Sequence, residues 1–424
     1  MKRNLFRIVS SLTMSVAMLS FFQGCGKISQ EEDEPVIMMD YPREDIVLTK
    51  AQAEYLNAGN QFAFKWLSIV NGEQEGDWFV SPLSMQYILG MFANGATEML
   101  VSEISLALGY KDAGTEEMND FLLYLSNQLK SLDPNTHIYT ANLALSDKNN
   151  PFKTAYKERV NSFYGAFVQD VTFSKPATVV DIVNNWASDN TKGVLKEVVS
   201  KDDIPTETIF ILGNVVYFKG EWINRFIKSN TKESVFYKRK GKIKVPMMQQ
   251  QGTFFGYQTE VFKQITLPYG NGAYQMDVFL PLESKGIEDV ISFLSQNGIS
   301  KGIPYIVDVW LPRFETETPK RNIYSHLQSL GISSLGLPYL EPMIYTFDNG
   351  NSINGSMFSV YHTAKIKVDE SGSEAAAATI AGASTGANLE TPAAMEFHAD
   401  HPFLYLIREV STGAILFAGK YGAE

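Results

Sequence analysis

The chain has 424 residues, of which 45% are hydrophobic, so it can bury a sizeable core in one large or two ordinary domains. Its 27 Phe and 20 Tyr favour a sheet-rich core. The formal net charge is −11, which argues against a nucleic-acid partner because phosphate binding needs clustered Lys and Arg. The basic run YKRKGKIK at 237–244 is typical of a solvated strand.

The first residues are typical of an export signal. Lys2, Arg3 and Arg7 form a basic head, and the apolar stretch that follows is too short for a membrane span. Cys25 is the only cysteine, and with the glycine before it the site resembles the lipobox of bacterial lipoproteins. We therefore predict a signal peptide over residues 1–24, lipidation of Cys25 and no internal disulfide.

An acidic segment follows the cysteine. Residues 25–48 include SQEEDE and two prolines, which predicts a tether. SQEEDE also resembles the acidic signals that carry lipoproteins to the cell surface in the Bacteroidetes; the alternative is a solvated linker without a targeting role. The protein is thus expected to be lipid-anchored to the bacterial outer membrane and to face the exterior.

From Thr49 the apolar spacing is helical, and TKAQ matches a capping box. Helical patterns dominate to about residue 130, and strand-like runs follow. Further helical stretches lie near 179–191, 287–296 and 324–330. The strand-like runs are HIYTANLAL, TIFILGNVVYFKG, QITLPY, AYQMDVFLPL, IVDVWLPRF, SVYHTAKIKV and FLYLIREVSTGAILFAGKY. Because no regular βαβ repeat and no internal boundary is evident, we predict one α+β domain over residues 49–424.

The sequence offers little evidence for an enzyme. A hydrolase of the Ser/His/Asp type needs a nucleophile beside a positioned base, and no such arrangement stands out. His398 and His401 have a spacing that a metal could use, but no cysteine or third histidine lies near them in the sequence. Nucleotide-binding glycine motifs are missing. We expect no enzyme activity, no metal and no cofactor.

Seven fragments, in order from about residue 58 to the C-terminus, resemble the serpin family. They are NQFAFKWL, FVSPLSMQYILGMFANGA, VNNWASDNTKGVL, ILGNVVYFKGEW, VDVWLPRF, YHTAKIKVDESGSEAAAAT and FHADHPFLYLIREVSTGAILFAGKY. The resemblance implies an α+β fold with three β-sheets, eight or nine helices and an exposed reactive-centre loop. It implies that a target serine protease cleaves this loop, forms an acyl-enzyme and is trapped covalently when the loop enters the main sheet as a new strand. The inhibitor is expected to be a monomer.

The segment ESGSEAAAATIAGASTGA at 370–387 suits that mechanism. Its small side chains also fit a flexible linker, but a linker does not explain why it lacks proline. A strand that enters a sheet needs small, uncharged side chains at every second residue, and the set from Ser373 to Ala383 meets this condition. On the serpin pattern the hinge comprises Glu370, Gly372, Ser373, Glu374, Ala375, Ala376, Ala377 and Ala378.

The scissile bond stays open between two counts. Counting from Glu370 places it between Gly386 and Ala387, whereas counting back from Phe397 favours a bond near Leu389. Thr385, Asn388, Leu389 and Glu390 are therefore alternatives. Small residues suit elastase-like or subtilisin-like proteases, and Leu389 would suit a chymotrypsin-like one. The absence of Lys and Arg between Glu370 and Arg408 argues against a trypsin-like target.

The resemblance also assigns structural roles. Arg313 matches the basic residue that pairs with Glu370 at the top of the main sheet, and Trp222 matches the tryptophan over the site of insertion. The polar cluster beneath the sheet centre, which must part for insertion, matches Ser81, Ser84, Asn214 and His362. Two other hypotheses remain: a non-inhibitory serpin-fold binding protein or substrate, and a lipoprotein hydrolase.

Overall fold

The structure is a computed structural model of the 424-residue chain. It describes residues 42–111, 113–318, 321–335, 339–340, 342–343, 358–373 and 392–423, all within one compact unit. The predicted signal peptide, Cys25, most of the tether and every candidate for the scissile bond lie outside the described residues. So do the hinge residues from Glu374 onwards.

Eight α-helices occur in the described residues. The predicted capping box begins the first of them, since Thr49 Oγ1 accepts from the amide of Gln52, and Gln52 Oε1 accepts from the amide of Thr49. The helices are α1 (Lys50–Glu73), α2 (Pro82–Ala93), α3 (Glu98–Leu108), α4 (Thr115–Leu129), α5 (Thr154–Tyr164), α6 (Pro176–Asn190), α7 (Ile287–Asn297) and α8 (Tyr324–Ser329). None of them is long and apolar enough to cross a membrane.

One sheet has nine strands. Its order is β1 (Trp78–Val80), β16 (Ile415–Tyr421), β15 (Phe403–Glu409), β8 (Tyr274–Pro281), β7 (Phe262–Tyr269), β6 (Gly241–Gln258), β9 (Ile303–Pro312) and β14 (Ala394–His398), with β5 (Lys232–Lys238) also paired to β6. The long β6 pairs with β5 and β9 over most of its length and with β7 at its end. Because β6 pairs with different strands along its length, strands that would otherwise belong to separate sheets form one nine-stranded sheet.

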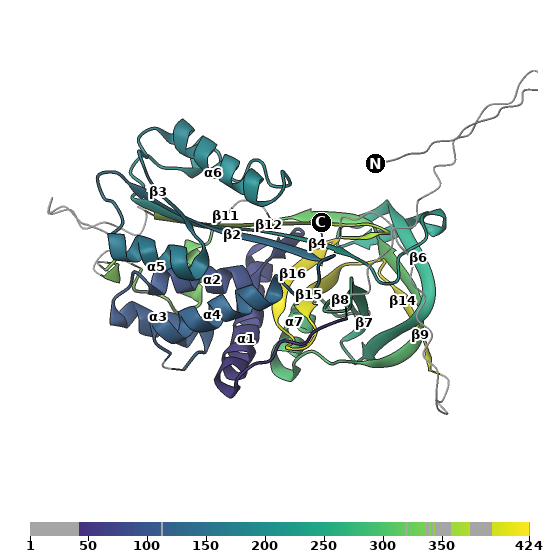
Figure 1. The fold of residues 1–424 in the computed structure, drawn as a ribbon. Helices are drawn as coiled ribbons and strands as arrows, with labels where there is room; N and C mark the ends of the chain where they lie inside the picture. The colour runs from purple at the N-terminus through teal and green to yellow at the C-terminus, as the bar shows by residue number, and fades with distance from the viewer. Residues whose placement is uncertain are drawn as a thin grey trace, which may run out of the picture. The chain divides into compact units, whose positions relative to one another are not determined.

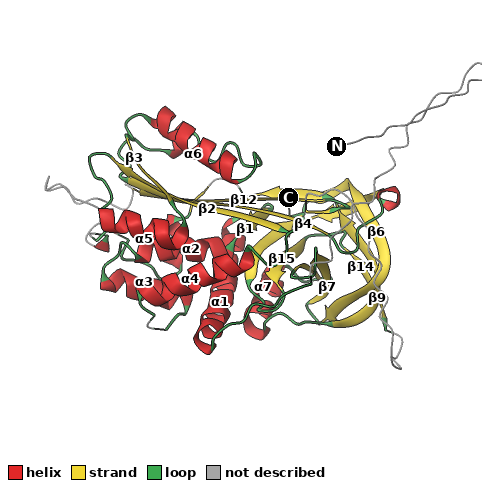
Figure 2. Cartoon of the chain, viewed as in Figure 1, coloured by secondary structure: helices red, strands yellow, loops and turns green. Residues whose placement is uncertain are grey.

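The second sheet has seven strands and carries the hinge. Its order is β10 (Phe314–Glu317), β12 (Phe358–Val368), β4 (Phe210–Glu221), β2 (His137–Asp147) and β3 (Phe167–Val171), with β11 (Arg321–Asn322) on β12 and β13 (Gly372–Ser373) on β4. The central strands β12 and β4 are parallel. Figure 1 shows α6 over one face of this sheet and α2 to α5 gathered on the other. The predicted α+β fold class is confirmed (Figure 2).

Both faces of β4 are buried, which explains its largely apolar sequence. Leu212 and Val216 face the main core, whereas Ile211 and Val215 belong to a second core cluster that includes residues of α6. On β12, Val360 and Ala364 also face the main core. The even-numbered residues of both central strands therefore point into the main core.

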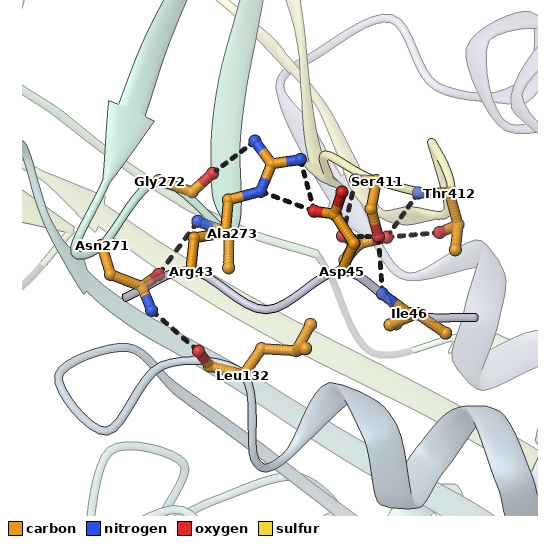
Figure 3. Close-up of polar contacts among 10 residues, drawn as sticks. Arg43, Asp45, Ile46, Leu132, Asn271, Gly272, Ala273, Ser411 and Thr412 are labelled. Carbon is orange, nitrogen blue, oxygen red and sulfur yellow. Dashed lines mark hydrogen bonds and ion pairs between the residues drawn. The ribbon is translucent and has the colours of Figure 1, made fainter. Parts of the chain in front are cut away.

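The chain before α1 is bound to the rest of the unit. Arg43 Nε and Nη2 donate to Asp45 Oδ1 at 2.9 and 2.7 Å, and Arg43 Nη1 reaches the carbonyl oxygen of Gly272 at 3.5 Å. The amide of Ile46 donates to Ser411 Oγ at 3.0 Å (Figure 3). Residues just before Thr49 thus contact the loops at Gly272 and Ser411.

Candidate functional site

The chain reverses direction where it leaves β12. The amide of Asp369 donates to the carbonyl oxygen of Gly372 at 2.9 Å, and the amide of Gly372 donates to the carbonyl oxygen of Asp369 at 3.2 Å. Gly372 has φ 145°, and a Cβ there would lie 2.2 Å from the oxygen of Gly220. The turn therefore requires glycine at 372.

After this turn the hinge lies beside β4 as a short antiparallel strand. Gly372 pairs with Glu221, and Ser373 pairs with Gly220. The direct pairing of β12 with β4 ends at Lys365 and Tyr217, just before this point. The two hinge residues thus pair with β4 beyond the end of its ladder with β12.

Ser373 points into the main core. It pairs with Gly220, which has the same parity along β4 as the core-facing Phe218. Its exposed fraction is 0%, and its Oγ lies 2.8 Å from the hydroxyl oxygen of Tyr269. The hydroxyl of Ser373 is therefore buried with a hydrogen-bond partner, as burial of a polar group requires.

Glu370 is held by a cation and a hydroxyl. Arg313 Nε donates to its Oε1 and Oε2 at 2.8 and 2.7 Å, and Arg313 Nη2 and the hydroxyl of Thr231 also donate to Oε1. Only 3% of the Glu370 side chain is exposed, against 43% for Arg313. Burial opposes ionisation, but the hydrogen bonds from Arg313 and Thr231 hold the pKa of Glu370 below its ordinary value. The structure thus brings together the predicted pair.

Trp222 covers the turn. Its indole Nε1 donates to the carbonyl oxygen of Asp369 at 3.0 Å, and its backbone amide donates to the carbonyl oxygen of Ser371 at 3.0 Å. The ring stacks on Tyr269 at 4.3 Å between centroids and 16° between planes. Trp222 therefore contacts both the turn and the partner of Ser373.

The structure brings three of the four predicted cluster residues into one hydrogen-bond network. The amide of Ser81 donates to His362 Nε2 at 3.0 Å, and the hydroxyl of Ser84 donates to Ser81 Oγ at 2.9 Å. Asn214 pairs with His362 across the central strands, but its amide group donates to Asn142 Oδ1 at 2.8 Å. Burial, together with the nearby His326, lowers the pKa of His362 to about 3, so the imidazole is neutral.

Sequence reasoning missed the partners of these residues. Thr231, Tyr269 and Asn142 were not predicted as site residues, yet each binds one that was. The run QITLPY predicted a strand that ends at Tyr269, but nothing in it points to Ser373. The signal that could have located these partners is the pairing of distant strands, which a single sequence does not contain.

The two spaced histidines diverge. His398 stacks on Trp310 at 4.4 Å, and its Nε2 lies 2.9 Å from Asp308 Oδ2. His401 Nε2 lies 2.9 Å from the carbonyl oxygen of Pro281. In the described ranges, no group of three His, Cys, Asp or Glu side chains is arranged to hold a metal ion.

Comparison with known proteins agrees with this geometry. Residues 57–422 match the family model described as "Serpin (serine protease inhibitor)". Iripin-1 of Ixodes ricinus is 30% identical over 86% of this chain and 93% of its own length. Antithrombin-III of Mus musculus is 28% identical over 95% of this chain and 87% of its own. The native stressed structure of Arabidopsis AtSerpin1 superposes with a TM-score of 0.77 at 26% identity, covering 88% of this chain and 98% of that one.

Proposed function

Because the chain belongs to the serpin family, whose members are typically serine protease inhibitors and not enzymes, we propose that it traps a serine protease by inserting its cleaved loop between β4 and β12. Serpins form covalent complexes with their target proteases. In this chain the protease would cleave the reactive loop, which lies C-terminal to Ser373. The acyl-enzyme would then be carried along as the loop enters the sheet.

The observation that carries the proposal is the position of Ser373 beside β4. Gly372 and Ser373 already run antiparallel to β4, with Ser373 facing the core. Continuing the strand would turn Ala375, Ala377 and every second residue to Ala383 toward the core, and all of these are small and uncharged. About a dozen inserted residues that gain ladder bonds at roughly 1 kcal/mol each could supply on the order of 10 kcal/mol.

The proposed target follows from the loop composition. Cleavage between Gly386 and Ala387 would suit an elastase-like or subtilisin-like protease, whereas cleavage at Leu389 would suit a chymotrypsin-like one. The mass of the C-terminal fragment released on cleavage would identify the bond. A fragment that begins at Ala387 supports the first class, and one that begins at Glu390 supports the second.

We also infer a membrane anchor from the N-terminal sequence. The lone Cys25 after a signal-like segment supports lipidation, and the acidic residues that follow support surface export on an outer membrane. Cys25→Ser in the full chain, expressed in a Bacteroidetes host, should move the protein from the membrane fraction to the soluble fraction. Equal membrane retention of the variant would overturn the anchor. Protease accessibility on intact cells tests the surface location.

The inhibitory function is tested with the domain from residue 42 onwards and elastase. A complex that survives boiling in detergent is expected. Clean loop cleavage without a complex would favour the alternative of a non-inhibitory serpin that serves as a binding protein or substrate.

Substitutions on opposite faces of the expected inserted strand distinguish insertion of the loop from simple cleavage. Ser373→Arg should retain loop cleavage and lose the complex, because the arginine would have to enter the core. The matched control is Glu374→Arg, whose side chain would fall on the opposite face of an inserted strand. A Ser373→Arg variant that still traps protease would overturn the insertion proposal.

A further inference from the structure

The strand that follows the reactive loop belongs to a sheet with one open face. On β9 Val307 and Val309 are buried, whereas Ile306 and Asp308 are partly exposed. The strands β14 and β6 show the same alternation next to it. The pairing of Ile306 with both Thr253 and Ala394 places the outward residues of the three strands on one side. We call this side the loop-end face: Gln251, Thr253, Phe255, Tyr257, Pro304, Ile306, Asp308, Ala394 and Glu396.

The loop-end face combines apolar groups with acids. Phe255 and Tyr257 are 55% and 36% exposed, which is unusual for aromatic side chains on adjacent outward positions of one strand. Asp308 and Glu396 lie on the same side, and the face contains no Lys or Arg. Lys263 reaches its edge, where Nζ donates to the carbonyl oxygen of Glu396 at 3.0 Å.

This face is continuous with the end of the reactive loop. The amide of Ile306 donates to the carbonyl oxygen of Ala393 at 2.9 Å, and the next residue, Ala394, begins β14. Ala394 is seven residues after Ala387, so even a fully extended chain places it within about 25 Å of the proposed scissile bond. A standard protein interface covers about 800 Å² of each partner, roughly 30 Å across. A footprint of this width that has the scissile bond near one edge can extend to Ala394 on the loop-end face.

We propose that the loop-end face is a second contact surface for the target protease, and that it recognises an apolar rim flanked by basic side chains. The inference rests on the proposed inhibitory function and adds to it a determinant of target choice outside the loop. Phe255 and Tyr257 supply the apolar contact, and Asp308 and Glu396 supply complementary charge, which speeds association.

The test measures the second-order rate at which elastase attacks the loop of the intact domain, whether attack ends in a complex or in cleavage. The double variant Phe255→Ser and Tyr257→Ser should slow attack about tenfold, with the ratio of complex to cleaved product unchanged. Phe167→Ser is the matched control, since Phe167 is 43% exposed but lies on β3, which belongs to the other sheet. The control should react at the wild-type rate.

A charge variant tests the chemistry of the partner. Glu396→Lys should slow attack by a basic protease, and this difference from the wild type should shrink as salt is raised. Rates equal to the control for both sets of variants would overturn the second contact surface. That result would leave the inhibitory proposal intact, because complex formation by the wild type is scored separately. Absence of any complex would refute trapping, while the attack rates would still decide the role of the face.

Discussion

The hydroxyl of Tyr269 and the hydroxyl of Ser373 meet at 2.8 Å, although the residues are 104 positions apart in the chain. The contact joins the end of β7 to the first two hinge residues, and it is buried beneath the ring of Trp222. It is the point at which the hinge is attached to the main core.

Tyr269→Phe should release the hinge. The change leaves the buried hydroxyl of Ser373 without its partner, which we expect to cost about 1 to 2 kcal/mol of unfolding free energy. Amide hydrogen exchange at Gly372 and Ser373 should accelerate. Tyr217→Phe is the control, since that hydroxyl is buried with no hydrogen-bond partner in the described part of the chain. Equal exchange in both variants would contradict the attachment.

The ion pair of Glu370 with Arg313 should be measurable by a double-mutant cycle. Glu370→Gln removes charge from a buried side chain that receives hydrogen bonds from Arg313 and Thr231, and we expect a loss of about 1.5 to 3 kcal/mol in unfolding free energy. Arg313→Met should cost less in the Glu370→Gln background than in the wild type, by about 1 kcal/mol or more. Additive losses in urea unfolding would show that the pair contributes no coupling.

Gly372→Ala should disrupt the turn. The new Cβ would lie 2.2 Å from the oxygen of Gly220, and φ 145° disfavours any side chain, so we expect a loss of about 2 kcal/mol or more in unfolding free energy. The hinge should leave β4, with faster amide exchange at Ser373. Gly72→Ala is the matched control, because a Cβ there meets nothing within 4 Å and the position lies in α1. The control should be neutral or slightly stabilising.

His362 should make the domain less stable in mild acid. Its pKa is about 3 in the folded protein and 6.5 ordinarily, so below pH 6.5 the unfolded chain takes up a proton that the folded one does not. Its contribution is complete above pH 6.5 and is lost at about 1.4 kcal/mol per pH unit as the pH falls toward 3. Between pH 7 and 5 the wild type should lose about 2 kcal/mol more than His362→Asn in urea unfolding. Parallel losses would show that His362 is not the titrating group.

Much of the fold can be predicted from local sequence patterns. The capping box at Thr49 predicts the start of α1, and the apolar runs predict β4 and β12, because local spacing shows which side chains are buried together. The small residues at every second position from Ser373 show that the loop is compatible with a strand. These properties depend on neighbours within a few residues, so a single sequence contains them.

The contacts that hold the hinge depend on how distant segments pack together. Thr231 and Arg313 reach Glu370, Tyr269 reaches Ser373, and Asn142 takes the side chain of Asn214. Each contact joins segments that are far apart in the chain and depends on which strands pair and in which register. A shift of one residue in β13 would turn Ser373 away from the core without any change in sequence. The loop-end face likewise exists only because β6, β9 and β14 align their outward residues on one side.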